Sequence, residues 1–300
     1  MSALFRGLRD GHGFDALLAL LALVYLLTFS AFPLIYNIVM SFQEVDMFSM
    51  ADLVRPFVGL ANYKALFASP DFWPILRNTA LFVLLSIVFQ LAIGFGLALF
   101  MQQDFPGATY LRGLFLAAWI MPALVVGAVW KWIFAGDFGV LNYFLSQLGL
   151  VGSKVFWLSD PAISLYSVTI ANIWLGIPFN MILLSVGLAG IPKDMYEAAA
   201  LDGANALQRF WHMTLPMMRS TLGAVISLGI IFTLQQFDLF ASLTQGGPAN
   251  ASNVAQYWSW QLSFQTYDIA SGSAVSCLML GFVIVVAVIY VRSTRHEHRA

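Results

Sequence analysis

Polar side chains interrupt two of the apolar runs in this sequence, and these side chains could contact a solute. In the run at residues 162–189, Asn172, Gly176 and Phe179 follow at spacings of four and three, which places them on one helical face. An amide, a bare backbone patch and an aromatic ring suit a sugar, because the amide can bond hydroxyl groups and the ring can cover an apolar sugar face. An alternative stays open: Gly176 could permit close helix contact, and Asn172 could bond a neighbouring helix.

A second polar group lies in the run at residues 219–243. Gln235 and Asp238 are three residues apart, so a continuous helix would place them on one face. A charge at mid-depth in a bilayer costs about 2.5–3.5 kcal/mol on insertion scales, which favours a functional role for polar groups there. Asp238 lies near the end of the run, where it could simply meet water. We predict that Asn172 and Gln235 contact the solute.

The polar stretch at residues 190–218 lies between two apolar runs and predicts a pair of short helices. Asp194 and Glu197 have the spacing of a capping box, which predicts a helix start, and alanines follow. Gly203 allows a turn that a side chain would obstruct. A second short helix is predicted after it, and Pro216 should end that helix. Such a compact knob could seat in a groove on another protein.

The composition excludes an ordinary soluble domain. Of the 300 residues, 60% are hydrophobic and 10% are charged, and the mean hydropathy is +0.81. A soluble domain of this length could not bury that much apolar surface. The formal net charge of −1 argues against a nucleic-acid partner. The single cysteine, Cys277, lies inside an apolar run, so no disulfide framework exists.

Six apolar runs are long enough to cross a hydrocarbon core, which takes roughly 20 helical residues. They lie at about residues 15–41, 73–101, 112–134, 162–189, 219–243 and 271–292. The first run is too long for a secretion signal, so we interpret it as an uncleaved span. We therefore predict an all-α membrane protein in which residues 1–300 form a single transmembrane domain with six transmembrane helices.

Basic residues predict the orientation of these helices. With a cytoplasmic N-terminus, nine basic residues face inward and five outward, a moderate positive-inside bias. The inner residues are Arg6, Arg9, Arg112, Lys193, Arg209, Arg219, Arg292, Arg295 and Arg299, and the outer ones are Arg55, Lys64, Arg77, Lys131 and Lys154. Both termini and residues 190–218 are then cytoplasmic, and the outer loops are about residues 42–72, 135–161 and 244–270.

The sequence predicts no enzyme site. No nucleophile–base pair or carboxylate pair appears where hydrolytic chemistry could be built. No group of histidines inside the spans predicts a metal site. The sequence also lacks the G-x4-G-K-[S/T] phosphate loop, so ATP hydrolysis would have to come from another protein.

The polar stretch resembles the coupling loop of binding-protein-dependent ABC importer permeases. The shared pattern is E-A-A-x3-G-x9-I-x-L-P, with Met213 in place of the usual isoleucine. The residues expected to couple to an ATPase are Glu197, Ala198, Ala199, Asp202, Gly203, Leu215 and Pro216. Weaker matches to the carbohydrate-uptake branch, of the maltose and glycerol-phosphate type, follow in order around the six spans at residues 57–63, 78–79, 106–112, 139–142 and 243–248.

The resemblance implies a multi-pass permease subunit of the bacterial cytoplasmic (inner) membrane with a two-helix cytoplasmic coupling loop. It implies a second homologous permease, two ATP-binding cassette subunits, an extracytoplasmic solute-binding protein and a carbohydrate substrate. ATP and magnesium would be bound by the ATPase subunits, and no cofactor is expected in this chain. Sugar permeases of this type use the span before the coupling loop, which adds to the interpretation of Asn172, Gly176 and Phe179.

The expected function is import of a sugar, oligosaccharide or glycoside. Two alternatives stay open, another solute and another class of transporter. The same class of importer could carry a polyol or a glycerol-phosphate-like solute, although the scarcity of Lys and Arg within the spans favours an uncharged one. An autonomous secondary transporter would need buried acids near mid-depth, and only Asp238 qualifies.

Overall fold

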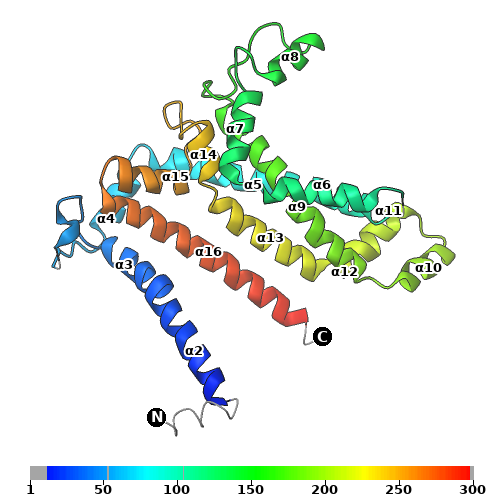
Figure 1. The fold of residues 1–300 in the computed structure, drawn as a ribbon, viewed down its shortest axis with the longest axis horizontal. Helices are drawn as coiled ribbons and strands as arrows, with labels where there is room; N and C mark the ends of the chain where they lie inside the picture. Colours follow the sequence, from blue (N-terminus) through cyan, green and yellow to red (C-terminus); the bar gives the residue numbers. More distant parts are fainter. Residues whose placement is uncertain (1–11, 53, 104, 298–300) are drawn as a thin grey trace. The chain divides into compact units, whose positions relative to one another are not determined.

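The computed structural model describes the backbone of residues 12–52, 54–103 and 105–297 (Figure 1). Arg6, Arg9 and Arg299, which entered the orientation argument, lie outside the described residues. Within the described ranges the chain is helical apart from turns, loops and one antiparallel bridge between Gln43 and Phe57.

The longer helices are α2 (His12–Leu26), α3 (Phe32–Met40), α5 (Phe72–Met101), α6 (Ala108–Ile120), α7 (Ala123–Ile133), α9 (Ser164–Ala189), α10 (Lys193–Leu201), α13 (Arg219–Leu234) and α16 (Ile269–Glu297). The short α-helices are α4 (Ala61–Ala68), α8 (Val140–Gln147), α11 (Ala206–Arg209), α12 (Leu215–Met217), α14 (Asp238–Leu243) and α15 (Ala255–Trp260). Three single π-turns, η1 (Leu27–Ala31), η3 (Phe210–Thr214) and η4 (Gln261–Gln265), and the 3₁₀ turn η2 (Ser49–Ala51) connect them.

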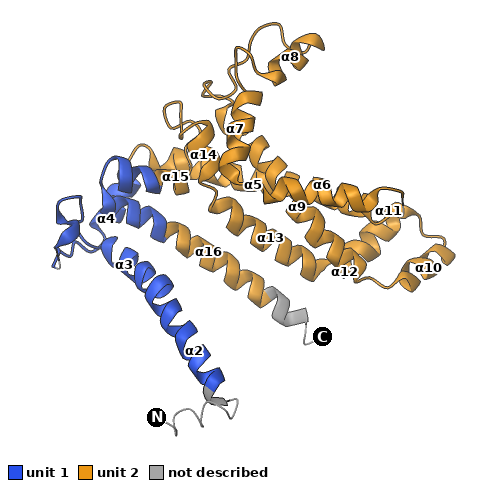
Figure 2. Cartoon of the chain, in the orientation of Figure 1, with its two compact units in different colours: residues 1–68, 259–277 blue, residues 69–258, 278–300 orange. Residues whose placement is uncertain are grey.

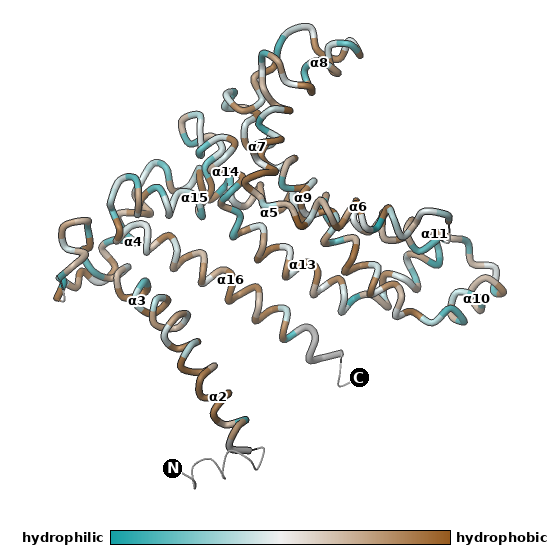
Figure 3. The backbone as a smooth tube through the Cα atoms, in the orientation of Figure 1, coloured by the Kyte–Doolittle hydropathy of each residue, from teal (hydrophilic) through white to brown (hydrophobic). Residues whose placement is uncertain are grey.

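Five helical segments of the described chain are long and apolar enough to cross a membrane. They are Phe14–Met40, Phe72–Met101, Ser164–Ala189, Arg219–Leu243 and Ile269–Arg292. Each agrees within a few residues with a predicted span, and Figure 3 shows α2 as a mostly hydrophobic stretch of the chain. The prediction of an all-α membrane protein is therefore confirmed.

At the third predicted span the chain forms two helices, α6 and α7, with a sharp bend between them. Together they are long and apolar enough to cross a membrane, and their angle of 97° is the geometry of a broken span or a re-entrant loop. Met121 is extended (φ −63°, ψ 133°) and Pro122 precedes α7. Proline disfavours the helical conformation in the residue before it and has no N–H to continue a helix, so the chain turns here.

Figure 2 shows two compact units, residues 1–68 with 259–277 and residues 69–258 with 278–300. In the first unit, the chain after α3 folds back on itself. The main-chain N–H of Val58 donates to Phe42 O, and the Asn62 side chain donates to the carbonyls of Ser41 and Gln43. These bonds order the segment between α3 and α4.

In the second unit, α5 and α9 form the closest helix pair, with α13 packed on both and α6 on α9. Gly94 permits this approach, because a Cβ there would lie only 2.7 Å from Asn180 Cβ. Buried side chains from α5, α9 and α13 and from the residues next to the ends of α9 and α13 form one apolar cluster of Phe95, Ala98, Met101, Met181, Leu184, Leu188, Ile191, Met218 and Val225.

Helix α7 packs on α14 through a second glycine. A Cβ at Gly127 would lie 1.8 Å from Ser242 Oγ and 2.8 Å from Ser242 Cβ, too close for any side chain. We expect Gly127→Ala to destabilise this contact by about 1–3 kcal/mol, because overpacking forces neighbours apart. The measurement is the thermal unfolding midpoint of the purified protein in detergent.

Gly113→Ala is the matched control for that experiment. Gly113 also lies inside a helix, and nothing lies within 4 Å of its Cβ position. Its replacement should leave the midpoint unchanged or raise it slightly, since alanine favours helix. Equal midpoints for the two variants would contradict the packing argument.

Candidate functional site

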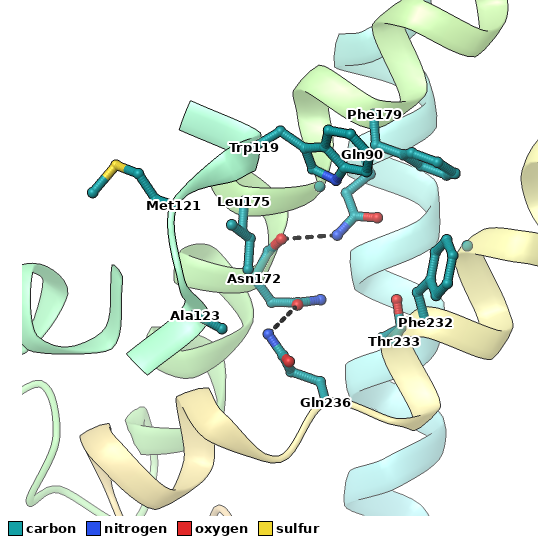
Figure 4. Close-up of a pocket in the computed structure, with 12 residues that line it drawn as sticks. Gln90, Trp119, Met121, Ala123, Asn172, Leu175, Phe179, Phe232, Thr233 and Gln236 are labelled. Atoms are coloured by element: carbon teal, nitrogen blue, oxygen red, sulfur yellow. Dashed lines mark hydrogen bonds between the residues drawn. The ribbon is translucent and has the colours of Figure 1, made fainter. Parts of the chain in front are cut away.

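A cavity of about 280 Å³ lies in the second unit, between α5, α9, α13 and the bend that joins α6 to α7 (Figure 4). Its twelve lining residues are Gln90, Trp119, Met121, Ala123, Asn172, Leu175, Gly176, Phe179, Gly229, Phe232, Thr233 and Gln236. None of them carries a formal charge, and both aromatic rings and amides are present. The broken third span contributes because its bend brings Met121 and Ala123 to the cavity wall.

The three residues predicted on the fourth span lie together as expected. Asn172, Gly176 and Phe179 all line the cavity, since α9 is a continuous helix through them. Figure 4 shows the Asn172 side chain directed toward Gln236. The predicted shared face is therefore present, while the predicted solute contact remains a prediction.

Hydrogen bonds hold Asn172 in place. Its Nδ2 donates to Ser86 Oγ at 2.9 Å, and its Oδ1 accepts a long bond of 3.4 Å from Gln236 Nε2. Asn172 is 5% exposed, and Ser86 is fully buried. The bond to Ser86 directs the amide nitrogen toward α5, so the amide oxygen lies on the Gln236 side.

The alternative interpretation of these residues, as helix-contact groups, also has structural support. Gly176 faces the Gln90 amide so closely that a Cβ would lie 2.3 Å from Gln90 Cδ. Asn172 bonds two neighbouring segments through Ser86 and Gln236. Both residues therefore join helices and line the cavity at the same time, and only a functional measurement separates the two roles.

Aromatic rings form the rest of the wall. The rings of Trp119 and Phe179 stack with centroids 5.7 Å apart at an interplanar angle of 28°. Phe232 meets Phe179 edge to face at 5.3 Å. Ring faces next to amide groups match the mixed apolar and hydroxyl surface of a pyranose.

The structure places the fifth-span residues differently from the sequence prediction. Helix α13 ends at Leu234 and α14 begins at Asp238, so Gln235 and Asp238 do not share a helical face, and that prediction was wrong. Both side chains are exposed, and neither is among the described lining residues. The next residue along the chain, Gln236, reaches the cavity, because the break in the helix changes the direction of the side chains.

The sequence analysis also missed Gln90 and Ser86 on α5. Gln90 lines the cavity, and Ser86 bonds Asn172. A signal was available, because Gln90 is a single amide in the middle of a long apolar run, four residues from a serine. Polar residues at that depth favour a functional role or a bond to another helix.

The predicted coupling loop is a second candidate site and contains α10, α11, η3 and α12. Helix α10 ends in a Schellman motif, in which Ala204 N–H donates to Ala199 O and Gly203 N–H donates to Ala200 O. Gly203 has φ +80°, a left-handed conformation that favours glycine. The predicted turn at Gly203 is thus present, and its cause is the backbone conformation, since nothing lies within 4 Å of the Cβ position.

Two details of this loop differ from the sequence prediction. The predicted capping box at Asp194 and Glu197 is absent, because α10 begins after Pro192 with no side-chain cap. The capping box lies instead at α11, where Asn205 and Gln208 exchange side-chain to main-chain bonds of 2.9 and 2.8 Å. Pro216 does not end the helical segment; it sits in the first turn of α12, where a missing N–H is tolerated.

The loop is anchored to the membrane helices on one side and exposed on the other. The Phe210 ring packs edge to face on Phe95 of α5, and within the loop the Tyr196 hydroxyl bonds Thr214 Oγ1 at 2.9 Å. Of the predicted coupling residues, the exposed ones are Glu197, Ala198, Asp202 and Gly203, and the partly buried ones are Ala199, Leu215 and Pro216. Leu201, with 90% of its surface exposed, adds an apolar side chain to the open face.

The model of the family described as "Binding-protein-dependent transport system inner membrane component" matches residues 90–296. The chain belongs to this family. The matched range includes all twelve residues of the cavity lining and the whole loop, so this protein is a membrane-spanning permease, a transport subunit. The resemblance to binding-protein-dependent ABC importer permeases is therefore confirmed.

Named relatives of this permease are similar over most of their length. The trehalose/maltose transport system permease protein MalF of Thermococcus litoralis is 33% identical over 80% of this chain and 81% of its own. The sulfoquinovosyl glycerol transport system permease protein SmoG of Agrobacterium fabrum is 30% identical over 94% of this chain and 91% of its own.

A solved structure supports the fold of the permease. A chain of a bacterial ABC transporter involved in the import of the acidic polysaccharide alginate superposes with a TM-score of 0.78 over 99% of both chains, at 20% identity. At that identity the likeness establishes the fold and nothing more. The helices of this permease are therefore arranged as they are in that transporter chain.

Proposed function

We propose that this permease carries a sugar, oligosaccharide or glycoside across the cytoplasmic membrane through a path that contains the cavity. The observation that carries the proposal is the cavity wall, where the Asn172 and Gln236 amides lie beside the stacked rings of Trp119 and Phe179. Amides bond hydroxyl groups, and ring faces cover the apolar side of a pyranose. The names of the two relatives, for trehalose/maltose and for sulfoquinovosyl glycerol, support a carbohydrate-like solute.

The proposed energy source is ATP hydrolysis by two partner ATP-binding cassette subunits that dock on the coupling loop. The exposed face of α10 and the turn at Gly203 form the docking surface in this proposal. Force applied there reaches the cavity through packed side chains, because Tyr196, Phe210 and Leu215 contact the apolar cluster of α5, α9 and α13. Helix α9 then carries the displacement from Ala189 to Asn172 without a break.

The proposed assembly contains a second homologous permease and an extracytoplasmic solute-binding protein. The termini and the coupling loop are cytoplasmic in this proposal, as the distribution of basic residues predicts. ATP binding and the loaded binding protein together favour an outward-open state, since a ligand shifts an equilibrium only by its differential affinity for the two states. Hydrolysis then returns the subunits to an inward-open state that releases the solute.

The first test is purification of the tagged permease from its native membranes in mild detergent, with mass spectrometry of the copurifying proteins. We expect an ATP-binding cassette protein and a second permease. The binding protein that belongs to the complex is then titrated with trehalose, maltose and sulfoquinovosyl glycerol, and the assembled importer is assayed for uptake. Copurification of no ATPase in several detergents, together with ATP-independent uptake, would refute the proposal.

A further inference from the structure

We infer that Gln90 of α5 is a further solute-contacting residue, which presents its side-chain oxygen as a hydrogen-bond acceptor for a solute hydroxyl. The inference rests on the proposed function and adds a polar residue from the second span to the cavity wall. It depends on the direction of the Gln90 amide, on the space in which the amide lies and on the lack of another partner for its oxygen.

The direction of the Gln90 amide follows from its partner. Gln90 Nε2 donates to the main-chain carbonyl of Asn172 at 2.8 Å. A carbonyl oxygen only accepts hydrogen bonds, so the amide nitrogen and not the oxygen must face it. The amide is planar, and Oε1 therefore points away from this bond. Figure 4 shows it directed toward the rings of Phe179 and Phe232.

The space for the amide comes from Gly176. A Cβ at Gly176 would lie 2.3 Å from Gln90 Cδ and Nε2 and 2.6 Å from Oε1. The amide therefore occupies the volume that any other residue at position 176 would fill. Gln90 is only 4% exposed, yet it lines the cavity, so its remaining exposure is to the cavity.

The oxygen of this amide has no partner among the described residues. No side chain or main-chain group of the described chain donates to Gln90 Oε1, whereas the nitrogen of the same amide is bonded. Gln90 Oε1 is not one of the fully enclosed unpaired side-chain atoms of the described chain, so it keeps surface open to the cavity that Gln90 lines. A donor from the cavity contents, a solute hydroxyl, completes the bonding of this amide.

The first experiment measures access to position 90. Gln90→Cys is prepared in a Cys277→Ser background, assembled with its partner subunits, and treated with a hydrophilic methanethiosulfonate reagent. We expect labelling, and we expect trehalose or maltose, whichever the wild-type importer transports, to slow it by about tenfold when saturating. Absence of labelling, or labelling that a transported sugar leaves unchanged, would overturn the inference. If the wild type transports neither sugar, sulfoquinovosyl glycerol takes their place, and if it transports none of the three, labelling alone decides whether position 90 opens to the cavity.

The second experiment separates solute contact from packing. Gln90→Leu keeps the approximate volume and should lower the sugar moved per ATP hydrolysed by about tenfold, the effect of one lost hydrogen bond. The double variant Gln90→Ala with Gly176→Ala refills the volume from the other helix. We expect this double variant to assemble and to unfold at the same temperature as the wild type, but not to transport the sugar.

Ser185→Ala is the matched control, because Ser185 bonds the Met181 carbonyl within α9 and does not line the cavity. It should leave the ratio of sugar to ATP unchanged. Recovery of transport in the volume-compensated double variant would reduce Gln90 to a packing residue and contradict the inference.

Discussion

Gly203→Asp is expected to abolish solute uptake while the permease is still inserted in the membrane at normal abundance. Gly203 has φ +80° within the Schellman motif that ends α10, and a side chain in the left-handed region costs about 1 kcal/mol or more. The new carboxylate would also stand on the exposed face proposed to receive the ATPase. Uptake, copurifying ATPase and membrane abundance are measured together.

Gly149→Asp provides the control for this prediction. Gly149 also has a left-handed backbone, with φ +67°, and nothing lies within 4 Å of its Cβ position. Its replacement imposes the same kind of backbone strain in the loop at residues 135–161, far along the chain from the coupling residues. Gly149→Asp should retain most of the uptake. Normal uptake by Gly203→Asp, at normal abundance, would refute the coupling assignment.

The second large effect is expected for Asn172→Ala, which should lower the maximal rate of uptake by roughly 10- to 100-fold. The variant removes the amide that bonds Ser86 and Gln236 and the proposed contact with the solute. Uptake is measured in vesicles with saturating binding protein, so that a change in maximal rate reports on the permease itself.

Asn180→Ala is the matched control for Asn172→Ala. Asn180 lies on the same helix, is equally buried, and bonds the Gly176 carbonyl, but it does not line the cavity. A loss of uptake as large in Asn180→Ala would show that helix packing, and not solute contact, explains the effect.

Gln236→Ala and Gln235→Ala form a second pair, in which only replacement of the cavity residue Gln236 should lower uptake. An equal loss in both would favour the original prediction for Gln235.

The turn at Gly203 was predictable from the sequence, because turn chemistry is local. A glycine after an alanine-rich helix predicts a left-handed helix end, and the structure has it. The capping box was misplaced by eleven residues, from Asp194 to Asn205, although both sites have suitable side chains. The two sites belong to different helices: α10 starts directly after Pro192, which places Asp194 inside its first turn and not at its N-cap.

The approximate bounds and the apolar character of five spans followed from the sequence by itself, because hydropathy and length are properties of each segment alone. The family followed from the motif of the polar stretch, and the shared face of Asn172, Gly176 and Phe179 followed from helical periodicity. Only the tertiary structure decided that the third span bends, that Gln236 and not Gln235 reaches the cavity, and that Gln90 fills the space beside Gly176. Those features depend on which helix faces meet and where helices break, and contacts between residues 86 positions apart, such as Ser86 and Asn172, leave no trace in local periodicity.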